Sequence, residues 1–217
     1  MNERIELDGW VLRVRRPETP APYDLIVLLH GWTGDEDVMW VFASRLPQNA
    51  YLIAPRALYP TSLGGYGWQE NPQDGWPNIT EFQPAIQKLW ELLSPLHFPD
   101  VNLSAIHWMG FSQGAALVYS LALLYPERVR SLACLAGFMP AGAEELAQNQ
   151  PLKGKAAFVA HGQRDELVPF EQALRAKDIL EKAGAQVTFC VDDIGHKLSA
   201  GCFRGLGRFF ARLPTQP

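Results

Sequence analysis

Residues 110–114 read Gly-Phe-Ser-Gln-Gly, the pattern G-x-S-x-G, at a point where a strand is expected to pass into a helix. The short apolar run 104–109 before the pattern is typical of a buried strand, and the run 115–125 after it is typical of a buried helix that ends at Pro126. A serine on so sharp a turn needs small residues two positions away on each side, because the backbone doubles back there. The turn lifts the Ser112 hydroxyl above the sheet and leaves the following amide free, so the pattern predicts a nucleophile. A helix N-cap is the alternative role for Ser112.

Length, charge and cysteine content exclude several classes of protein. The chain has 217 residues, which fits one domain, and its net charge of −4 with 19% charged residues gives no basic surface for nucleic acid. The first residues lack the pattern of a signal peptide, and no apolar run approaches the roughly 18 residues of a membrane span. The chain has an odd number of cysteines: Cys134, Cys190 and Cys202. We interpret them as separate buried thiols in a reducing compartment. These features predict a soluble cytoplasmic protein without stable membrane insertion.

Short apolar runs alternate with longer amphipathic ones along the chain, which indicates a mostly parallel sheet covered by helices on both faces. One or two strands are expected within Ile5–Val14, with a turn at Asp8-Gly9. The other expected strands are Asp24–Leu29, Ala50–Ala54, 104–109, Val129–Leu135, Lys155–Ala160 and Gln186–Val191. The expected helices are Val38–Leu46, Glu81–Leu93, 115–125, a short one near Ala143–Gln148, Glu171–Ala183 and Ser199–Leu213. The pattern predicts a single α/β domain over residues 1–217.

Residues 57–80 interrupt this regularity. The segment is rich in proline and glycine and carries Tyr59, Tyr66, Trp68 and Trp76. A long irregular connection in a compact domain is usually functional or disordered, and large aromatic side chains are costly to leave in water. We therefore predict an ordered flap over the active site, which could serve as a lid or as the interface of a homodimer.

A serine needs a base to take its proton and an acid to orient that base. In α/β-hydrolases these groups follow the serine in the order acid, then histidine, each on a loop after a strand. His161 and His196 are the histidines downstream of Ser112, and the order selects His196 as base with Asp165 as acid. His161 as base remains an alternative. The alternative acids are Glu166, Asp192 and Asp193.

Acyl transfer also requires hydrogen-bond donors for the developing oxyanion. The backbone N–H of Gln113, directly after the serine, is one candidate. A second should come from the loop after an early strand, and Leu28–Gly34 fits because an apolar strand there opens into a turn flanked by glycines. We assign the second donor to the amide of Trp32.

These segments together resemble the phospholipase/carboxylesterase family of small α/β-hydrolases, which includes bacterial carboxylesterases and acyl-protein thioesterases. The resemblance spans Leu25 to Phe210 and is carried by Leu29–Gly31, residues 110–115, Leu135–Pro140, His161–Pro169 and Gly195-His196. It implies an α/β-hydrolase fold without a large cap domain. It places the family's nucleophile, acid and base on Ser112, Asp165 and His196 and its oxyanion amides on Trp32 and Gln113, in agreement with the residue patterns. It implies no metal and no cofactor.

The chain departs from the family pattern where substrate would enter. Trp32 stands where a small aliphatic residue is usual, and 65–70 replaces the usual Trp-Phe-Asp-like stretch. We predict a serine hydrolase of carboxylic esters with small to medium apolar or aromatic acyl groups. The alternatives are a thioesterase, lysophospholipase or amidase with the same residues, or a non-catalytic binding protein on the same scaffold. Besides Trp32, the predicted substrate pocket consists of Leu63, Tyr66, Trp68, Phe138, Met139 and Leu167.

Overall fold

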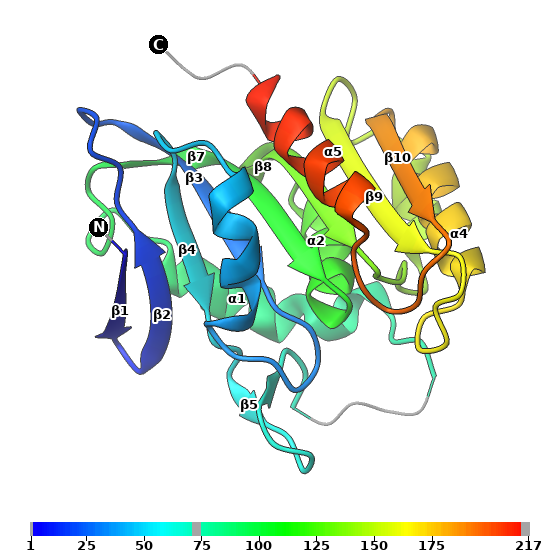
Figure 1. Cartoon of the computed structure of the whole chain (residues 1–217), viewed down its shortest axis with the longest axis horizontal. Helices are drawn as coiled ribbons and strands as arrows, with labels where there is room; N and C mark the ends of the chain where they lie inside the picture. Colours follow the sequence, from blue (N-terminus) through cyan, green and yellow to red (C-terminus); the bar gives the residue numbers. More distant parts are fainter. Residues whose placement is uncertain (1, 71–74, 214–217) are drawn as a thin grey trace.

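The computed structural model describes residues 2–70 and 75–213. Its centre is an eight-stranded sheet in the order β1-β2-β4-β3-β7-β8-β9-β10, in which β1, β2 and β4 pair antiparallel and β4, β3 and β7 to β10 pair parallel (Figure 1). The strands are β1 Asn2–Leu7, β2 Trp10–Arg15, β3 Tyr23–Leu29, β4 Tyr51–Pro55, β7 Val101–Phe111, β8 Val129–Leu135, β9 Ala156–Gly162 and β10 Gln186–Asp192.

Helices cover both faces of this sheet. The 3₁₀ helix η1 (Val38–Arg45) and α5 (Ala200–Ala211) lie in front of the sheet in Figure 1, and the other helices lie behind it. Those behind are η2 (Ile79–Phe82), α1 (Gln83–Leu92), α2 (Gln113–Leu124), η3 (Pro126–Arg128), α3 (Ala143–Ala147) and α4 (Phe170–Lys182). Within the described residues no insertion is long enough to form a separate cap domain. The predicted α/β class with a mostly parallel sheet is confirmed.

The central strands are apolar on both faces because each face packs against helices. Every residue of β3 from Leu25 to Leu29 is buried, and successive side chains point to opposite faces of the sheet. Leu25, Val27 and Leu29 pack behind the sheet with α2, whereas Ile26 and Leu28 pack in front with η1 and α5. This two-sided core fixes the carboxyl ends of the parallel strands at one edge, where ligands bind in open α/β sheets.

The N-terminal strands form a hairpin whose turn is at Asp8-Gly9, as predicted. Both turn residues have positive φ, 47° at Asp8 and 82° at Gly9, and Gly9 takes that conformation without a steric cost. The predicted helix at Val38–Leu46 is present as the 3₁₀ helix η1, and the one at Glu81–Leu93 is divided into η2 and α1.

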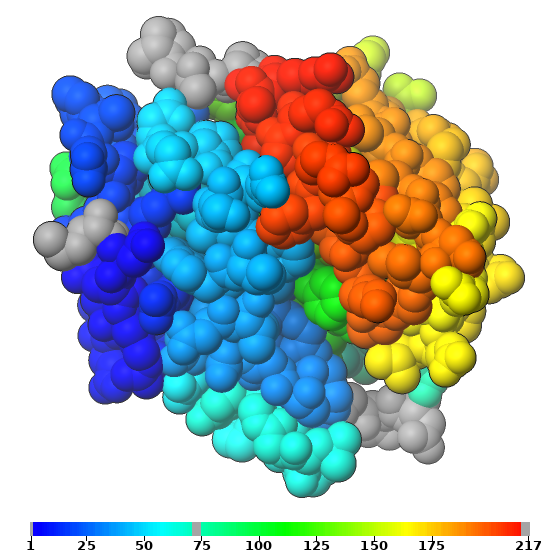
Figure 2. All heavy atoms as spheres, viewed as in Figure 1, coloured from blue at the N-terminus to red at the C-terminus, as the bar shows by residue number. Residues whose placement is uncertain are grey.

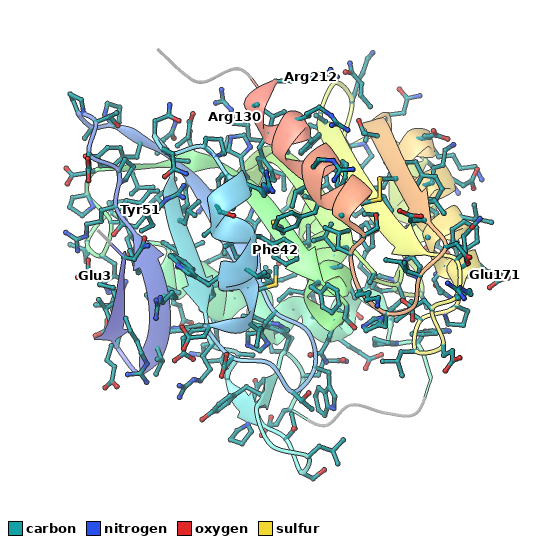
Figure 3. The ribbon with its side chains drawn as sticks, in the orientation of Figure 1. Glu3, Phe42, Tyr51, Arg130, Glu171 and Arg212 are labelled. Carbon is teal, nitrogen blue, oxygen red and sulfur yellow. A yellow bond between two sulfur atoms is a disulfide. The ribbon has the colours of Figure 1, made fainter. Side chains whose placement is uncertain are left out.

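Two features differ from expectation. The segment predicted as an irregular flap contains a short hairpin, β5 (Tyr59–Pro60) and β6 (Tyr66–Gly67), while residues 71–74 of it lie outside the described residues. The interpretation of Cys190 and Cys202 as separate thiols is wrong: they form a disulfide with 5.7 Å between their Cα atoms, seen as a yellow bond in Figure 3. The bond joins β10 to α5 through two cysteines that are 12 positions apart in the sequence. Cys134 is free and buried.

None of the helices in the described part of the chain is both long enough and apolar enough to span a membrane.

Candidate active site

Ser112 occupies a sharp turn between β7 and α2. Its backbone has φ 53° and ψ −117°, a conformation that residues other than glycine rarely adopt. Its N–H donates to the carbonyl of Leu135 at 2.9 Å. A Cβ added at Gly110 would clash with the backbone of Gly114, and one at Gly114 would clash with the carbonyl of Leu29. The two glycines are therefore required by the close approach of backbone segments around the serine.

The side chain of Ser112 makes no capping hydrogen bond to α2, so it does not act as a side-chain N-cap. Its carbonyl oxygen accepts the N–H groups of Ala115 and Ala116 instead. Among the described residues, the backbone N–H groups of Gln113 and Trp32 have no acceptor. Two unpartnered amides beside the turn are available to a substrate oxygen.

The loop that carries the Trp32 amide is braced by His30. The buried His30 ring donates Nδ1–H to the Gly31 carbonyl at 2.7 Å, and its Nε2 accepts the N–H of Ala57 at 2.9 Å. Burial lowers the pKa of His30, which favours the neutral ring that this pattern of donor and acceptor requires. A Cβ at Gly31 would lie 3.1 Å from the Cβ of Ser112, so the loop passes directly over the serine.

Asp165 lies after β9 and is held by four contacts. Its Oδ1 accepts the backbone N–H groups of Leu167 and Val168 at 3.0 and 2.9 Å. Its Oδ2 accepts Nδ1–H of His196 at 2.7 Å and lies 3.4 Å from Nε2 of His161. These contacts fix the carboxylate, and the predicted acid and base lie in direct contact although 31 residues separate them in sequence.

Only one of the two histidines beside Asp165 is reachable from solvent. The side chain of His161 is 0% exposed and that of His196 is 16% exposed. His161 Nε2 lies 2.8 Å from the carbonyl of Val168, and burial lowers the pKa of its ring. His161 therefore supports the loop that presents Asp165, whereas His196 faces outward.

Phe111 places His196 close to the serine turn. The rings of Phe111 and His196 pack edge to face with 5.0 Å between their centroids, and Phe111 directly precedes Ser112. Although both residues are described, no direct hydrogen bond joins Ser112 Oγ to the His196 ring. Such bonds are often long in proteins without bound substrate and tighten when the complex forms.

The side chain of Gln113 connects the serine turn to the segment between β4 and α1. Its Oε1 accepts the N–H of Trp68 at 2.9 Å, and its amide nitrogen donates to Gln69 at 3.3 Å. The indole Nε1–H of Trp68 donates to the carbonyl of His30 at 2.8 Å. Residues 68 and 69 thus contact both the serine turn and the loop of Trp32.

Trp32, one of the residues predicted for the substrate pocket, packs against β6. A Cβ at Gly67 would clash with its six-membered ring, and the N–H of Tyr66 bonds the carbonyl of Gly34 at 2.9 Å. The indole therefore lies on the β5–β6 hairpin (residues 59–67), and the absence of a side chain at Gly67 makes room for it.

A charge cluster around the buried carboxylate of Glu36 anchors the same loop. Glu36 receives hydrogen bonds from Arg4 on β1 and from Arg56 after β4. Burial alone would raise the pKa of Glu36, but these two guanidinium groups prevail and lower it to about 2. Arg56 also stacks on Tyr66 at 4.7 Å from the ring centre, so the cluster connects the loop to the hairpin.

The structure does not gather the six residues predicted for the substrate pocket into one lining. Trp68 and Met139 are core residues, and Tyr66 packs beneath Arg56. Leu63 is exposed at the tip of the hairpin, and Leu167 is exposed two residues after Asp165. The ring of Phe138 packs at a tilt against that of Trp76, with 4.6 Å between ring centres, and Gly137 beside it lies against the carbonyl of Ser112.

An apolar cleft that the sequence did not predict lies on the other side of the serine. It has a volume of about 440 Å³. Its lining comes from the loop after β3, from η1, from the serine turn, from the loop between β10 and α5 and from α5 itself: Gly31, Trp32, Thr33, Gly34, Val38, Met39, Val41, Phe42, Phe111, Lys197, Leu198 and Phe203. We call this space the front cleft because η1 and α5 lie on the front face in Figure 1.

No group of three or more His, Cys, Asp or Glu side chains in the described residues is placed to hold a metal ion.

The fold and the strained serine turn define the chain as an α/β-hydrolase. A family model described as Phospholipase/Carboxylesterase matches residues 11–212, and the chain belongs to that family. It is a serine hydrolase of the esterase type.

The chain is also similar to curated proteins, one of which is named a carboxylesterase and one a synthase. The chain is 31% identical over 191 residues to a "Probable carboxylesterase SOBER1-like" of Arabidopsis thaliana, covering 80% of this chain and 72% of the relative. It is 30% identical over 173 residues to a "Putative 2-succinyl-6-hydroxy-2,4-cyclohexadiene-1-carboxylate synthase" of Bacillus subtilis, covering 75% of this chain and 58% of that longer relative. Among solved structures, the Bacillus cereus carboxylesterase superposes with a TM-score of 0.83 at 21% identity and covers 95% of both chains.

Proposed function

We propose that the chain hydrolyses carboxylic esters with small to medium apolar or aromatic acyl groups, with Ser112 as nucleophile, His196 as base and Asp165 as the orienting acid. The observation that carries the proposal is the 2.7 Å hydrogen bond from His196 Nδ1 to Asp165, made beside a serine held on a strained turn. Asp165 holds the imidazole with Nδ1 protonated, which leaves Nε2 free to accept a proton.

In the first half of the reaction, Ser112 Oγ attacks the ester carbonyl while its proton passes to Nε2 of His196. The carbonyl oxygen becomes an oxyanion, and the unpartnered N–H groups of Trp32 and Gln113 donate to it. One such donor is worth about 3 kcal/mol of barrier in other enzymes. His196 then returns the proton to the departing alcohol oxygen, and the acyl group stays on Ser112.

In the second half, water replaces the alcohol. His196 accepts a proton from the water, the resulting tetrahedral intermediate is again stabilised by the two amides, and the carboxylic acid leaves as Ser112 regains its proton. The neutral, buried His161 does not exchange protons with solvent along this route. Its role in the proposal is to support the loop of Asp165.

The acyl group is assigned to the side of Ser112 on which Phe138 lies. Gly137 is against the carbonyl of Ser112, and the packed rings of Phe138 and Trp76 offer an aromatic surface there. Leu167, exposed two residues after Asp165, adds an aliphatic side chain near the same loops. These surfaces support an apolar or aromatic acyl group, as the sequence suggested.

A fluorophosphonate probe tests the nucleophile directly, because it reacts with an activated serine whatever the substrate. We expect labelling of the unaltered protein at neutral pH and its loss in Ser112→Ala and His196→Ala. Ser120→Ala is a matched control, since Ser120 is a buried serine of α2 whose hydroxyl donates to the carbonyl of Ala116. A folded, unaltered protein that resists labelling would contradict the proposal.

The leaving group is then found by comparing kcat/KM for p-nitrophenyl esters, acyl thioesters and acyl amides that share one acyl group. We expect esters to give the highest value. If a thioester or an amide gave a higher kcat/KM than the ester with the same acyl group, Ser112 would keep its assigned role. The substrate class would then be thioesters or amides in place of esters.

A further inference from the structure

We infer that the front cleft binds the alcohol portion of the ester, and that this portion is an apolar group of medium length. The inference rests on the proposed roles of Ser112 and His196 and assigns a site that those roles leave open.

The front cleft adjoins the reacting atoms. Phe111, which precedes the serine, lines it, and so do Gly31 and Trp32 of the loop that passes over the serine. Figure 2 shows green atoms, the colour of the serine turn, between the blue atoms of the segment around η1 and the orange atoms at the start of α5. A group bound in the front cleft would therefore begin at Ser112 and extend away from it.

The side on which the cleft lies decides which portion of the ester it takes. Lys197 and Leu198 in its wall follow His196 directly, and the ring of Phe111 packs against the ring of His196. Because His196 must hand its proton to the alcohol oxygen, that oxygen lies on the His196 side of the carbonyl carbon. The group attached to this oxygen then points into the front cleft, while the acyl group points toward Phe138.

The lining decides the chemistry of that group. Met39 and Phe42 are buried in the wall, and Phe42, labelled in Figure 3, contacts Phe203 of α5 with 5.7 Å between ring centres. At the rim, Val38 is 50% exposed and Val41 is 62% exposed. Lys197 is the one charged side chain among the described lining residues. Apolar walls with an exposed apolar rim favour an alkyl or phenylalkyl alcohol over a sugar or a charged headgroup.

The size is suitable for such a group. About 440 Å³ falls within the range of small-molecule sites in proteins, and the rim is open to solvent. Each methylene that enters apolar surroundings should raise kcat/KM by roughly fourfold until the cleft is filled.

Two series of esters test the inference. In the first, the acyl group is fixed as acetyl and the alcohol runs from methanol to 1-hexanol and 2-phenylethanol. In the second, the alcohol is fixed as methanol and the acyl group is lengthened. We expect kcat/KM to rise along the first series, and Val41→Trp, which places a bulky side chain at the rim, to flatten that rise.

In the same variant, the rise of kcat/KM with acyl length in the second series should keep its slope, because the acyl group points away from the front cleft. Leu96→Trp is a matched control, because Leu96 is 93% exposed and is not part of the lining. It should reproduce the unaltered protein in both series.

A second readout follows from the reversibility of the alcohol step. When p-nitrophenyl acetate forms the acetyl-enzyme, an added alcohol competes with water: its oxygen bonds the acetyl carbon, its proton passes through His196 to Ser112, and an acetate ester is released. We expect 1-hexanol to capture the acetyl group at least tenfold better than methanol at equal concentration, and Val41→Trp to abolish this preference.

The outcomes separate the two proposals. Hydrolysis that is independent of alcohol length, or a Val41→Trp variant that alters the acyl series in place of the alcohol series, would overturn the assignment of the front cleft and leave the proposed function intact. Failure of the unaltered, folded protein to hydrolyse any ester or to react with the fluorophosphonate would overturn both.

Discussion

The side-chain oxygen of Gln113 accepts the backbone N–H of Trp68, 45 residues earlier in the chain, at 2.9 Å. The backbone of Gln113 follows the serine, and its side chain fixes the segment that covers the loop of Trp32. One residue therefore couples the proposed oxyanion amides to the segment above them.

Replacing Gln113 with methionine should destabilise the protein by about 1–3 kcal/mol, because the buried N–H of Trp68 loses its acceptor. The backbone amide at position 113 is retained, so activity should fall less than in Ser112→Ala. Urea unfolding followed by tryptophan fluorescence measures the difference. Gln148→Met, at an exposed position, should leave the midpoint unchanged, and an equal midpoint for both variants would show that the Gln113 contact adds nothing.

Asp165→Asn should lower kcat/KM by about 10³–10⁴-fold on the proposed mechanism, because an amide side chain holds the imidazole in the wrong tautomer. Asparagine also lacks one of the oxygens that accept Leu167 N, Val168 N and His196 Nδ1. The control is Asp193→Asn, an alternative acid that instead pairs with Arg164 on the surface. Steady-state kinetics with one good ester decides, and a larger loss in Asp193→Asn would refute the assignment.

Gly114→Ala should prevent stable folding or cost more than about 3 kcal/mol, because the added methyl meets the carbonyl of Leu29, part of the central sheet. Gly205→Ala in α5 is the comparison. A Cβ there meets the ring of Phe158 at 3.5 Å, an ordinary contact, and alanine favours the helix by roughly 0.5–1 kcal/mol. The midpoint temperature of thermal unfolding should fall in Gly114→Ala and rise in Gly205→Ala.

Acid should destabilise the protein through His107. Burial lowers the pKa of this residue to about 4, with Asp24 acting to raise it and Arg130 to lower it. Between pH 6.5 and pH 4, His107 is protonated in the unfolded chain but stays neutral in the folded protein. The free energy of unfolding is therefore at its full value above pH 6.5 and is lower by about 3 kcal/mol at pH 4. His107→Asn, which can still bond Ser131, should show a correspondingly smaller loss between pH 7 and 4 in urea unfolding.

Reduction of the Cys190–Cys202 disulfide should cost about 3 kcal/mol by the entropy of the loop that it closes. His196 lies in that loop, six residues from each cysteine, so reduction should also lower kcat. Cys190 is partly exposed and can be reached by a reductant. The double variant C190S/C202A should have the kcat of the reduced protein, and reductant should not change it. If reductant does not change the kcat of the unaltered protein either, the loop is held by its other contacts.

The sequence predicted the sheet, its helices and the contact between Asp165 and His196 because these depend on patterns within short segments and on chain order. The front cleft could not be predicted in this way, since its walls come from the loop after β3, η1, the serine turn, the loop between β10 and α5, and α5. Trp68 was assigned to the pocket from its aromatic character, but its indole turns inward to bond the carbonyl of His30. The disulfide depends on how β10 and α5 cross, and periodicity carries no information on that crossing.

The packing of Trp32 on Gly67 has an evolutionary consequence. The indole ring fills the volume in which a side chain at position 67 would lie, so the two positions share one space. A substitution that enlarges residue 67 becomes acceptable only after residue 32 shrinks, and the reverse order passes through an unfavourable intermediate. Among relatives of this chain, a larger residue at position 67 should therefore occur together with a smaller residue at position 32. A library that randomises both positions together should recover active combinations that single substitutions miss.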